Sequence, residues 1–471
     1  MRGGGDLDAI VGQPAAVAPL SLHRYPRSAV FYRKLARDLP LIVRGEGCWL
    51  IDEDGRRYLD ASGGAFVANI GHGVAEIADV MATQGRQLAY VSGAMFTHQP
   101  VEELAGAIAA LCPGDLDKVY PLSSGSDAVE AALKLARQYW VERGLDSKRT
   151  IVALAPAYHG NTLLALSASP REHYRAYYHD WLVDVVHIRA PYPYRCACRG
   201  APPYCPSCSG DALEEAIVRA GPDTVAAFIA EPVGGSSTGA SVPQRDYHRR
   251  VREICDRHDV LFIADEVLTG AGRTGSWSAI EQYGVVPDIL ILGKGISGGY
   301  APLSAVVAPE RIADVLAQGS GAFVHAQTFS HHPLSCAVGA AVIGYIRRHR
   351  LMERCATVGA TFHRKLNVLL DLPHVGDVRG RGLLAGVELV QDVETRAPFP
   401  RSLRVAESFA AAAQDAGLVV WPNTAHIDGG DGDLVMLAPP FVIEETEIDE
   451  LVRRFVAALH TTLARLPAAR A

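Results

Sequence analysis

The middle of the chain, from Lys118 to Val307, alternates between short apolar runs and longer stretches with helical spacing. Such runs have the length of buried strands, and helices between them are typical of a parallel-sheet α/β domain. The predicted strands are Val119–Leu122, Ile151–Leu154, Val185–Ile188, Val225–Ala230, Leu261–Ala264, Ile289–Leu292 and Ala305–Val307. We expect crossover helices over Asp246–Arg257 and Pro309–Leu316.

The pattern changes after Pro333, where helices and strands no longer alternate regularly. Helices are predicted over Leu334–His349, Glu353–Leu369 and Glu445–Ala464, and strands over Leu383–Leu389 and Val419–Val420. Because 471 residues are many for one core, we expect two domains. Residues 1–70 would form an N-terminal arm, loose up to about Ser28, and part of the small domain. Residues 71–330 would form the large α/β domain, and residues 331–471 the small α+β domain.

The strand Ile289–Leu292 ends in the tight turn Gly293-Lys294-Gly295. A lysine at the end of a buried strand loses solvent, which favours its neutral amine, the form that makes a Schiff base with a carbonyl. Two other interpretations stay open. Lys294 could be a surface residue of a flexible loop, or Gly293, Gly295 and Gly298 could be a dinucleotide fingerprint. No helix pattern opens after Gly298, which disfavours the fingerprint.

Other reactive residue types follow the neighbouring strands, where ligands of parallel sheets bind. Gly125 and Ser126 begin a predicted helix and could bind an anion there, although plain N-capping explains them equally well. Tyr158 could stack on a flat ligand or sit at the edge of the core. Glu231 and Asp265 end buried strands, so each needs a cationic or hydrogen-bonded partner, such as a protonated ring nitrogen or Arg273. A phosphate, a ring nitrogen and an aldehyde occur together in pyridoxal 5′-phosphate (PLP).

The segments Asp265–Gly270, Gly272–Gly275 and Gly293–Leu303 resemble the class III PLP-dependent aminotransferases, the omega-transaminase group. The resemblance implies the PLP-dependent transferase fold of type I and a homodimer with its active site at the subunit interface. It implies a Schiff base between Lys294 and PLP, and Asp265 paired with the ring nitrogen. The further positions that it implies around the cofactor are Val267 and Tyr158 on the two ring faces, His159 beside them, Gly125 and Ser126 at the phosphate, Glu231, and Thr328 at the partner's phosphate.

The chain also departs from the family pattern. Ala326-Gln327 replaces a glycine-histidine pair, His331 replaces a glycine, and Asp127 replaces a glutamate. Many relatives place a carboxylate-binding arginine in the small domain, but Val405–Val452 contains no arginine or lysine. Such a charge would have to come from elsewhere, for example Arg273 or Arg381, or the substrate is neutral or cationic at that end.

Four cysteines, Cys196, Cys198, Cys205 and Cys208, lie in an insert at residues 191–210. Their spacing is compatible with a structural zinc site, which would staple the loop without doing chemistry. Free thiols and a disulfide are the alternatives.

The composition limits the partners and the compartment. The net charge of −7 argues against a nucleic-acid or anionic-membrane partner held by bulk charge. No apolar stretch reaches the length of a membrane span, and the N-terminus lacks the apolar core of a secretory signal, so we expect a cytoplasmic protein.

We therefore predict a transaminase that moves an amino group from an amine or amino acid donor to a keto acid, ketone or aldehyde acceptor. The alternatives are another class III PLP enzyme (an aminomutase, a decarboxylase or an epimerase), a nicotinamide oxidoreductase, and a non-catalytic zinc-binding scaffold.

Overall fold

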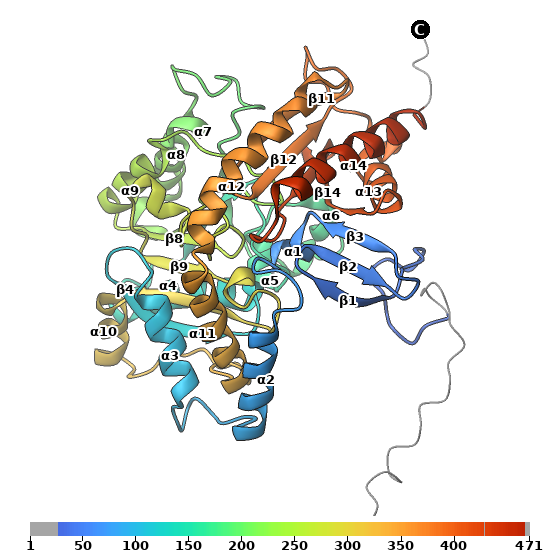
Figure 1. The fold of residues 1–471 in the computed structure, drawn as a ribbon. Helices are drawn as coiled ribbons and strands as arrows, with labels where there is room; N and C mark the ends of the chain where they lie inside the picture. The colour runs from blue at the N-terminus through green and yellow to red at the C-terminus, as the bar shows by residue number, and fades with distance from the viewer. Residues whose placement is uncertain (1–26, 428, 467–471) are drawn as a thin grey trace, which may run out of the picture.

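The computed structural model describes residues 27–427 and 429–466 (Figure 1). The predicted loose arm, up to about Ser28, lies almost entirely outside these residues. The strands are β1 (Ile42–Glu46), β2 (Trp49–Asp52), β3 (Arg57–Asp60), β4 (Leu116–Leu122), β5 (Thr150–Ala155), β6 (Val186–Arg189), β7 (Val225–Ala230), β8 (Leu261–Glu266), β9 (Ile289–Leu292), β10 (Ser304–Pro309), β11 (Val375–Arg381), β12 (Leu384–Leu389), β13 (Leu418–Val419), β14 (Trp421–Ile427) and β15 (Asp431–Leu437).

The longer helices are α2 (Ala75–Gln87), α3 (Gln99–Ala109), α4 (Gly125–Glu142), α8 (Asp211–Ala220), α9 (Tyr247–Arg257), α10 (Glu310–Gln318), α11 (Pro333–Arg348), α12 (Leu351–Leu366), α13 (Val405–Asp415) and α14 (Glu445–Leu463). Short helical turns are α1 (Gly63–Phe66), α5 (Leu163–Ser167), α6 (Glu172–Arg175) and α7 (Pro206–Ser209). Among the described residues, no helix has the length and apolar character needed to cross a membrane.

The central sheet has seven strands in the order β4-β10-β9-β8-β7-β5-β6. The strands from β9 to β6 run parallel, as the alternating pattern predicts. The last strand, β10, instead pairs antiparallel with both β9 and β4. The link from Leu292 to Ser304 is too short for the helical crossover that a parallel neighbour needs. The mainly parallel α/β fold class is therefore confirmed, and only the direction of this strand differs from the regular pattern.

Helices cover both faces of this sheet, so its inner strands are apolar on both sides. Ile289 and Ile291 of β9 belong to the apolar cluster that includes the buried face of α4. Leu290 and Leu292 belong to the opposite cluster, with residues of α3, α8 and α9. Alternate side chains of a strand point to opposite faces, so a strand buried on both sides reads as a continuous apolar run. This double burial places the strand ends, and the residues that follow them, at one edge of a rigid layer.

Two smaller sheets complete the molecule. One is antiparallel, in the order β11-β12-β15-β14, and it shares an apolar cluster with α12, α13 and α14. The other has the order β1-β2-β3-β13, with β13 parallel to β3. The second sheet draws strands from both ends of the chain, and Figure 1 shows β1–β3 beside the C-terminal helix α14.

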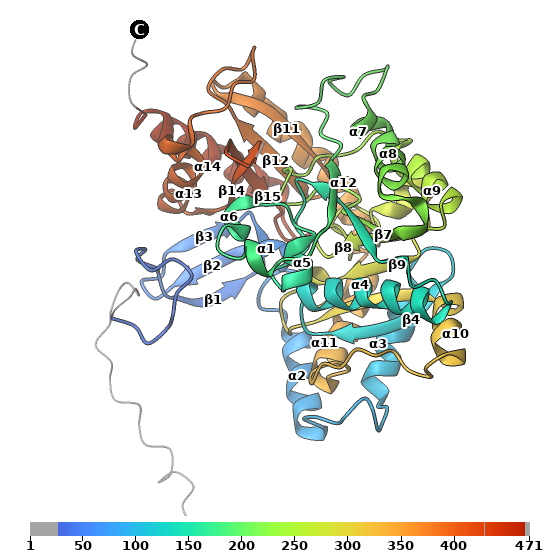
Figure 2. The same cartoon turned by 180° about the vertical axis from the view of Figure 1, so that it is seen from behind.

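Helices α2, α3 and α11 pack together at one end of the molecule, as both cartoon views show (Figures 1 and 2). Helix α11 contributes to two apolar clusters. Val338 and Val342 face the cluster of the small sheets, and Cys336 and Ile343 face the cluster of the central sheet. This helix therefore ties the two parts of the fold together.

Candidate active site

Lys294 lies two residues past the end of β9, after Gly293, and starts a short 3₁₀ turn, Lys294–Ile296. Its backbone is left-handed, with φ of 45°, and its side chain is partly exposed. The turn is held by Asn69, whose Nδ2 donates to the Gly295 carbonyl at 2.9 Å. Burial lowers the pKa of Lys294 to about 8, against the opposing charges of Asp265 and Glu231. The amine is therefore far easier to deprotonate than that of a surface lysine.

Asp265 lies on β8, the strand next to β9, and is 4 % exposed. Its Oδ2 lies 2.7 Å from Nδ1 of the buried His159, and its Oδ1 accepts the Val267 amide at 3.1 Å. Burial of His159 disfavours its cation, but the hydrogen bond and the charge of Asp265 prevail and raise the pKa of His159. The other nitrogen, His159 Nε2, is buried without a hydrogen-bond partner among the described residues.

Arg273 does not pair with Asp265, so that alternative is wrong. Its guanidinium is buried and donates to the carbonyls of Leu383 at 2.9 Å and Pro439 at 2.6 Å. Arg381 is also engaged elsewhere, because it donates to Gln282 at 3.0 Å. Among the described residues, Arg273 Nη2 is buried without a hydrogen-bond partner, so the hydrogen bonds of Arg273 occupy only part of its guanidinium.

The N-terminus of α4 supplies a candidate anion site. Ser124 caps this helix by accepting the Asp127 amide at 3.2 Å, which leaves Gly125 and Ser126 as the first two helical residues. Their unpaired amides and the helix dipole favour a bound anion. A Cβ at Gly125 would lie 2.9 Å from Cγ1 of Val267, and a Cβ at Gly293 would lie 3.1 Å from the same atom. Val267 therefore contacts both the helix N-terminus and the turn that carries Lys294.

Tyr158 and Glu231 lie beyond the ends of β5 and β7. The Tyr158 amide donates to Glu231 Oε2 at 3.4 Å, and the Tyr158 hydroxyl accepts from Asn161 Nδ2 at 3.2 Å. Glu231 also accepts from the Gly235 amide at 3.0 Å and from Ser237 Oγ at 3.2 Å. Burial raises the pKa of Glu231 above its ordinary value.

Thr328 is exposed in the segment between α10 and α11, away from the contacts described above. Its neighbour Gln327 ties this segment to α4, with Nε2 donating to Asp127 at 2.8 Å. Two departures from the family pattern thus contact each other, because Gln327 and Asp127 are the changed residues. His331, the third, has φ of 57°, a conformation that glycine adopts more easily.

Sequence reasoning missed several residues near the lysine. The Phe66 ring centroid lies 5.2 Å from Lys294 Nζ and 5.4 Å from the Trp421 ring. Arg171 is 5 % exposed and donates to Asn423 and Ser236. These residues come from segments far apart in the chain, and no local pattern marks them. A short helical turn that ends at Phe66 and an arginine in a loop carry no signal without the tertiary fold.

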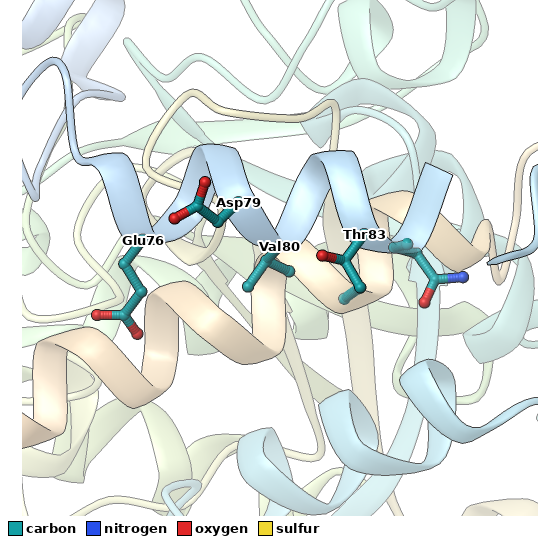
Figure 3. Close-up of a pocket in the computed structure, with 6 residues that line it drawn as sticks. Glu76, Asp79, Val80 and Thr83 are labelled. Carbon is teal, nitrogen blue, oxygen red and sulfur yellow. The ribbon is translucent and has the colours of Figure 1, made fainter. Parts of the chain in front are cut away.

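The pocket in Figure 3 lies outside the candidate active site. It follows α2 beside α11 and is lined by Glu76, Asp79, Val80, Thr83, Gln84 and Ala337. No residue of the predicted site contributes to it. The candidate site is therefore defined by the strand ends and not by this surface hollow.

The arrangement agrees with known proteins. Residues 32–459 match the family model described as aminotransferase class-III. The uncharacterized aminotransferase YodT of Bacillus subtilis is 38 % identical over 434 residues, which are 91 % of this chain and 98 % of YodT. The chain belongs to the class III aminotransferases.

Solved structures agree in fold. A transaminase from the marine bacterium Virgibacillus superposes with a TM-score of 0.85 at 34 % identity, over 92 % of this chain and 95 % of that one. The omega transaminase from Pseudomonas jessenii in complex with PMP gives a TM-score of 0.83 at 31 % identity, over 91 % of this chain and 93 % of the other. The chain is thus a PLP-dependent enzyme of amino-group transfer. The comparisons do not favour the aminomutase, decarboxylase, epimerase, oxidoreductase or scaffold alternatives.

Proposed function

We propose that this class III aminotransferase binds PLP between Lys294, Asp265 and the N-terminus of α4, and transfers an amino group from a small-molecule amine to a carbonyl acceptor. The observation that carries the site assignment is the position of Val267. Its methyl groups contact the Gly125 and Gly293 positions, and its amide donates to Asp265. One residue thereby joins the anion site, the lysine turn and the buried carboxylate.

The residues fit the three polar ends of the cofactor. Gly125 and Ser126 would hold the phosphate, Asp265 would hold the proton of the ring nitrogen, and Lys294 would hold the aldehyde as a Schiff base. Val267 and Tyr158 would press on the two ring faces, with Glu231 beside Tyr158. When bound, PLP supplies an electron sink for the bond that breaks at the substrate carbon.

His159 orients Asp265 at that end of the site. The hydrogen bond from His159 Nδ1 fixes the Asp265 carboxylate in place and stabilises its charge. An ionised and oriented carboxylate is the group that keeps a ring nitrogen protonated. His159 is therefore a positioning residue in this proposal.

Lys294 also moves the proton. When it is not bound to the cofactor, its Nζ would be the group that takes a proton from the substrate carbon and gives it back. A pKa of about 8 suits this task, because general acid–base groups work best when their pKa lies near the working pH. Phe66 limits the space next to this amine and helps to keep water away from it.

A homodimer belongs to the same proposal. Tyr90, Met95, Phe96, Val324 and Phe329 are exposed large apolar residues in two neighbouring segments, and the Tyr90 and Phe329 rings lie 6.3 Å apart. An apolar patch of this kind supports a protein interface. Thr328, exposed beside Phe329, would then reach the phosphate of the partner subunit.

The remaining parts of the proposal are the compartment and the metal. The nine cysteines are all free thiols, which is compatible with a reducing cytoplasm. The proposal also includes structural zinc at Cys196, Cys198, Cys205 and Cys208. These residues are not among those that would hold the cofactor.

Borohydride reduction of the loaded enzyme, followed by peptide mass mapping, tests the assignment. We expect a pyridoxyl adduct on the peptide with Lys294 and none in Lys294→Ala, while the surface variant Lys365→Ala keeps it. An amine donor alone should convert the bound cofactor stably to its pyridoxamine form. An adduct on another lysine, or release of carbon dioxide instead of this conversion, would contradict the proposal.

A further inference from the structure

The cysteine-rich insert brings its four sulfur atoms to one point. Cys196 Sγ lies 3.3 Å from the sulfur atoms of Cys198 and Cys208, and Cys198 Sγ lies 3.6 Å from that of Cys205. All four lie within 4.8 Å of one another. A zinc ion about 2.3 Å from each of four thiolates would place the sulfur atoms about 3.8 Å apart. We propose that these four cysteines bind one structural zinc ion.

The local backbone explains how the sulfur atoms converge. The segment turns back after Cys196 and Cys198, where Arg199 and Gly200 have φ of 51° and 72°. Cys205 then stands at the N-cap position of α7, the short helix whose third residue is Cys208. The first pair therefore comes from a loop and the second from a helix start, as in many zinc sites built from two short turns.

The burial of the four cysteines also favours a bound metal ion over a disulfide. Cys196 and Cys208 are 6 % and 1 % exposed, whereas Cys198 and Cys205 are partly open to solvent. The ion can thus enter from outside and lose its water on the inner side. A disulfide would bring only two sulfur atoms to about 2.0 Å and gives no reason for the other two to stay at the same point. Zinc binding would release the thiol protons to solvent and leave no open coordination position.

The position of the insert gives the metal a structural role. The segment before Cys196 reaches the small sheet, where the Tyr192 hydroxyl donates to Glu388 Oε2 at 2.5 Å and Arg195 Nε donates to Glu388 Oε1 at 2.6 Å. Both cartoon views show the loop beside α7 close to β11 (Figures 1 and 2). Zinc would therefore fix the segment that links the central sheet to the antiparallel sheet.

Metal analysis of the full-length enzyme, purified under reducing conditions without added zinc or chelator, tests this proposal. We expect close to one zinc per chain, and a lowered melting temperature after chelation. Cobalt in place of zinc should give the visible bands of tetrahedral thiolate coordination. Cys208→Ser should lose the metal, and Cys112→Ser, a cysteine outside the cluster, should keep it.

Two results would overturn the zinc site. One is reduced wild-type protein that neither contains zinc nor takes up one equivalent. The other is an unchanged zinc content in Cys208→Ser. Because the wild-type measurements suffice, a variant that fails to fold does not spoil the test. Cofactor loading is measured separately, so a failure here leaves the aminotransferase assignment intact.

A second observation concerns the substrate, and it rests on the proposed function. Arg171 is almost fully buried, yet its partners are all neutral. They are Asn423 Oδ1, Ser236 Oγ at 3.3 Å and the Thr424 carbonyl at 3.4 Å. No carboxylate forms an ion pair with it among the residues of the described ranges. A buried guanidinium without a counter-ion is costly, and a ligand carboxylate would relieve that cost.

Contacts connect Arg171 to the lysine site from two sides. Its guanidinium lies 5.4 Å from the Tyr174 ring, which is 5.7 Å from the Tyr158 ring. Its partner Asn423 lies on β14, two residues after Trp421. The Trp421 ring packs on the Phe66 ring, which lies beside Lys294. We infer that Arg171, rather than Arg273 or Arg381, receives the carboxylate of an acidic substrate.

Acceptors with and without a carboxylate test this role. Arg171→Gln should lower kcat/KM for pyruvate about 10- to 100-fold, mainly through KM, which corresponds to about 1.4–2.8 kcal/mol of lost binding to the carboxylate. Activity with propanal should change little, and Arg171→Lys should restore part of the loss with pyruvate. Arg381→Gln is the control.

Equal losses with both acceptors would show a purely structural role and overturn the inference. A selective loss in Arg381→Gln would move the assignment to that residue. A wild-type enzyme that carries out no amine-driven conversion would instead count against the proposed function, so the two failures are distinguishable.

Discussion

Among single residues, the hydrogen-bonded pair of Asp265 and His159 sets the charge at the far end of the cofactor site. Asn at position 265 keeps the shape and removes the charge that would hold a proton on the ring nitrogen. We expect Asp265→Asn to lower kcat on the order of 10²- to 10⁴-fold, as for other groups that act on proton placement. Steady-state kinetics with saturating PLP measures this.

The control is Asp256→Asn, which changes a carboxylate on the surface of α9 that pairs with Arg252. Its kcat should stay at the wild-type level. Wild-type turnover by Asp265→Asn would remove Asp265 from the proposed site.

The lowered pKa of Lys294 predicts how cofactor uptake depends on pH. Burial disfavours the ammonium form, so the amine becomes neutral as the pH rises through about 8 and not near 10.5. Only the neutral amine attacks an aldehyde. The rate of PLP uptake by the cofactor-free protein should therefore rise with pH up to about 8 and level off above it. Stopped-flow absorbance measures this rate, and a rate that still rises steeply between pH 9 and 10 would contradict the prediction.

Residues at the end of a predicted strand could be found from the sequence, because strand ends meet at one edge. Asp265 lies near the end of β8, and Lys294 lies two residues past the end of the adjacent strand β9. Phe66, Arg171 and Trp421 could not be found this way. Their positions depend on how a turn after β3, a loop after α5 and a strand of another sheet meet in space.

Helix α4 begins with a glycine, and the binding site at its N-terminus depends on the missing side chain. Its first residue is Gly125, and a Cβ there would meet Cγ1 of Val267 at 2.9 Å. We expect Gly125→Ala to push Val267 toward the cofactor ring and to weaken PLP binding about tenfold, which is about 1.4 kcal/mol. Equilibrium dialysis or cofactor titration measures the Kd.

Gly85 of α2 is the matched control, since a Cβ there has no neighbour within 4 Å. Gly85→Ala should leave PLP binding unchanged and stabilise the fold by up to about 1 kcal/mol, because alanine favours a helix over glycine. A similar Kd for both variants would show that the close approach at Gly125 does not matter.

In the central sheet, the positions of the inner strands could be predicted from the sequence, but the direction of β10 could not. Burial on both faces makes β7 and β9 continuous apolar runs, and their bounds follow from the sequence. Strand β8 continues two residues past the predicted end at Ala264, through the buried carboxylates Asp265 and Glu266. The direction of β10 does not follow from the sequence, because its pattern is the same for either orientation and only the length of the preceding link decides. Strand β1 and helix α2 carry weaker patterns and were not predicted.

For the whole molecule, one buried carboxylate joins the central sheet to the antiparallel sheet. Glu388 of β12 is fully buried and pairs with Arg379 at 2.9 Å and Arg195 at 2.6 Å. Burial opposes its ionisation, but Arg379, His426 and Arg195 hold the pKa of Glu388 well below its ordinary value. The stability from this cluster is thus present at neutral pH and is lost as the solution is acidified below the ordinary glutamate range.

Glu388→Gln should therefore destabilise the fold by about 3–5 kcal/mol at pH 7, the cost of leaving buried charges unpaired. Its unfolding free energy should fall less than that of the wild type on acidification to pH 4, because the variant lacks the titrating group. Chemical denaturation at several pH values measures both effects. Glu394→Gln, on an exposed loop, should behave like the wild type.

The exposed apolar patch argues that the complete active site needs two chains. Met95 and Phe329 are 75 % and 57 % exposed, and Thr328 stands next to Phe329 without burying its own side chain. A charge in the middle of an apolar interface must lose its water without gaining a partner, so Met95→Asp and Phe329→Asp should each shift the enzyme toward a monomer. We expect the monomer to lose PLP faster on dialysis, because the partner's Thr328 would no longer reach the phosphate.

Light scattering measures the oligomeric state, and residual cofactor absorbance measures the loss of PLP. Val393→Asp, at an equally apolar but distant exposed site, is the control. A wild-type monomer with stable PLP would place the whole cofactor site within one chain and leave Thr328 without a role.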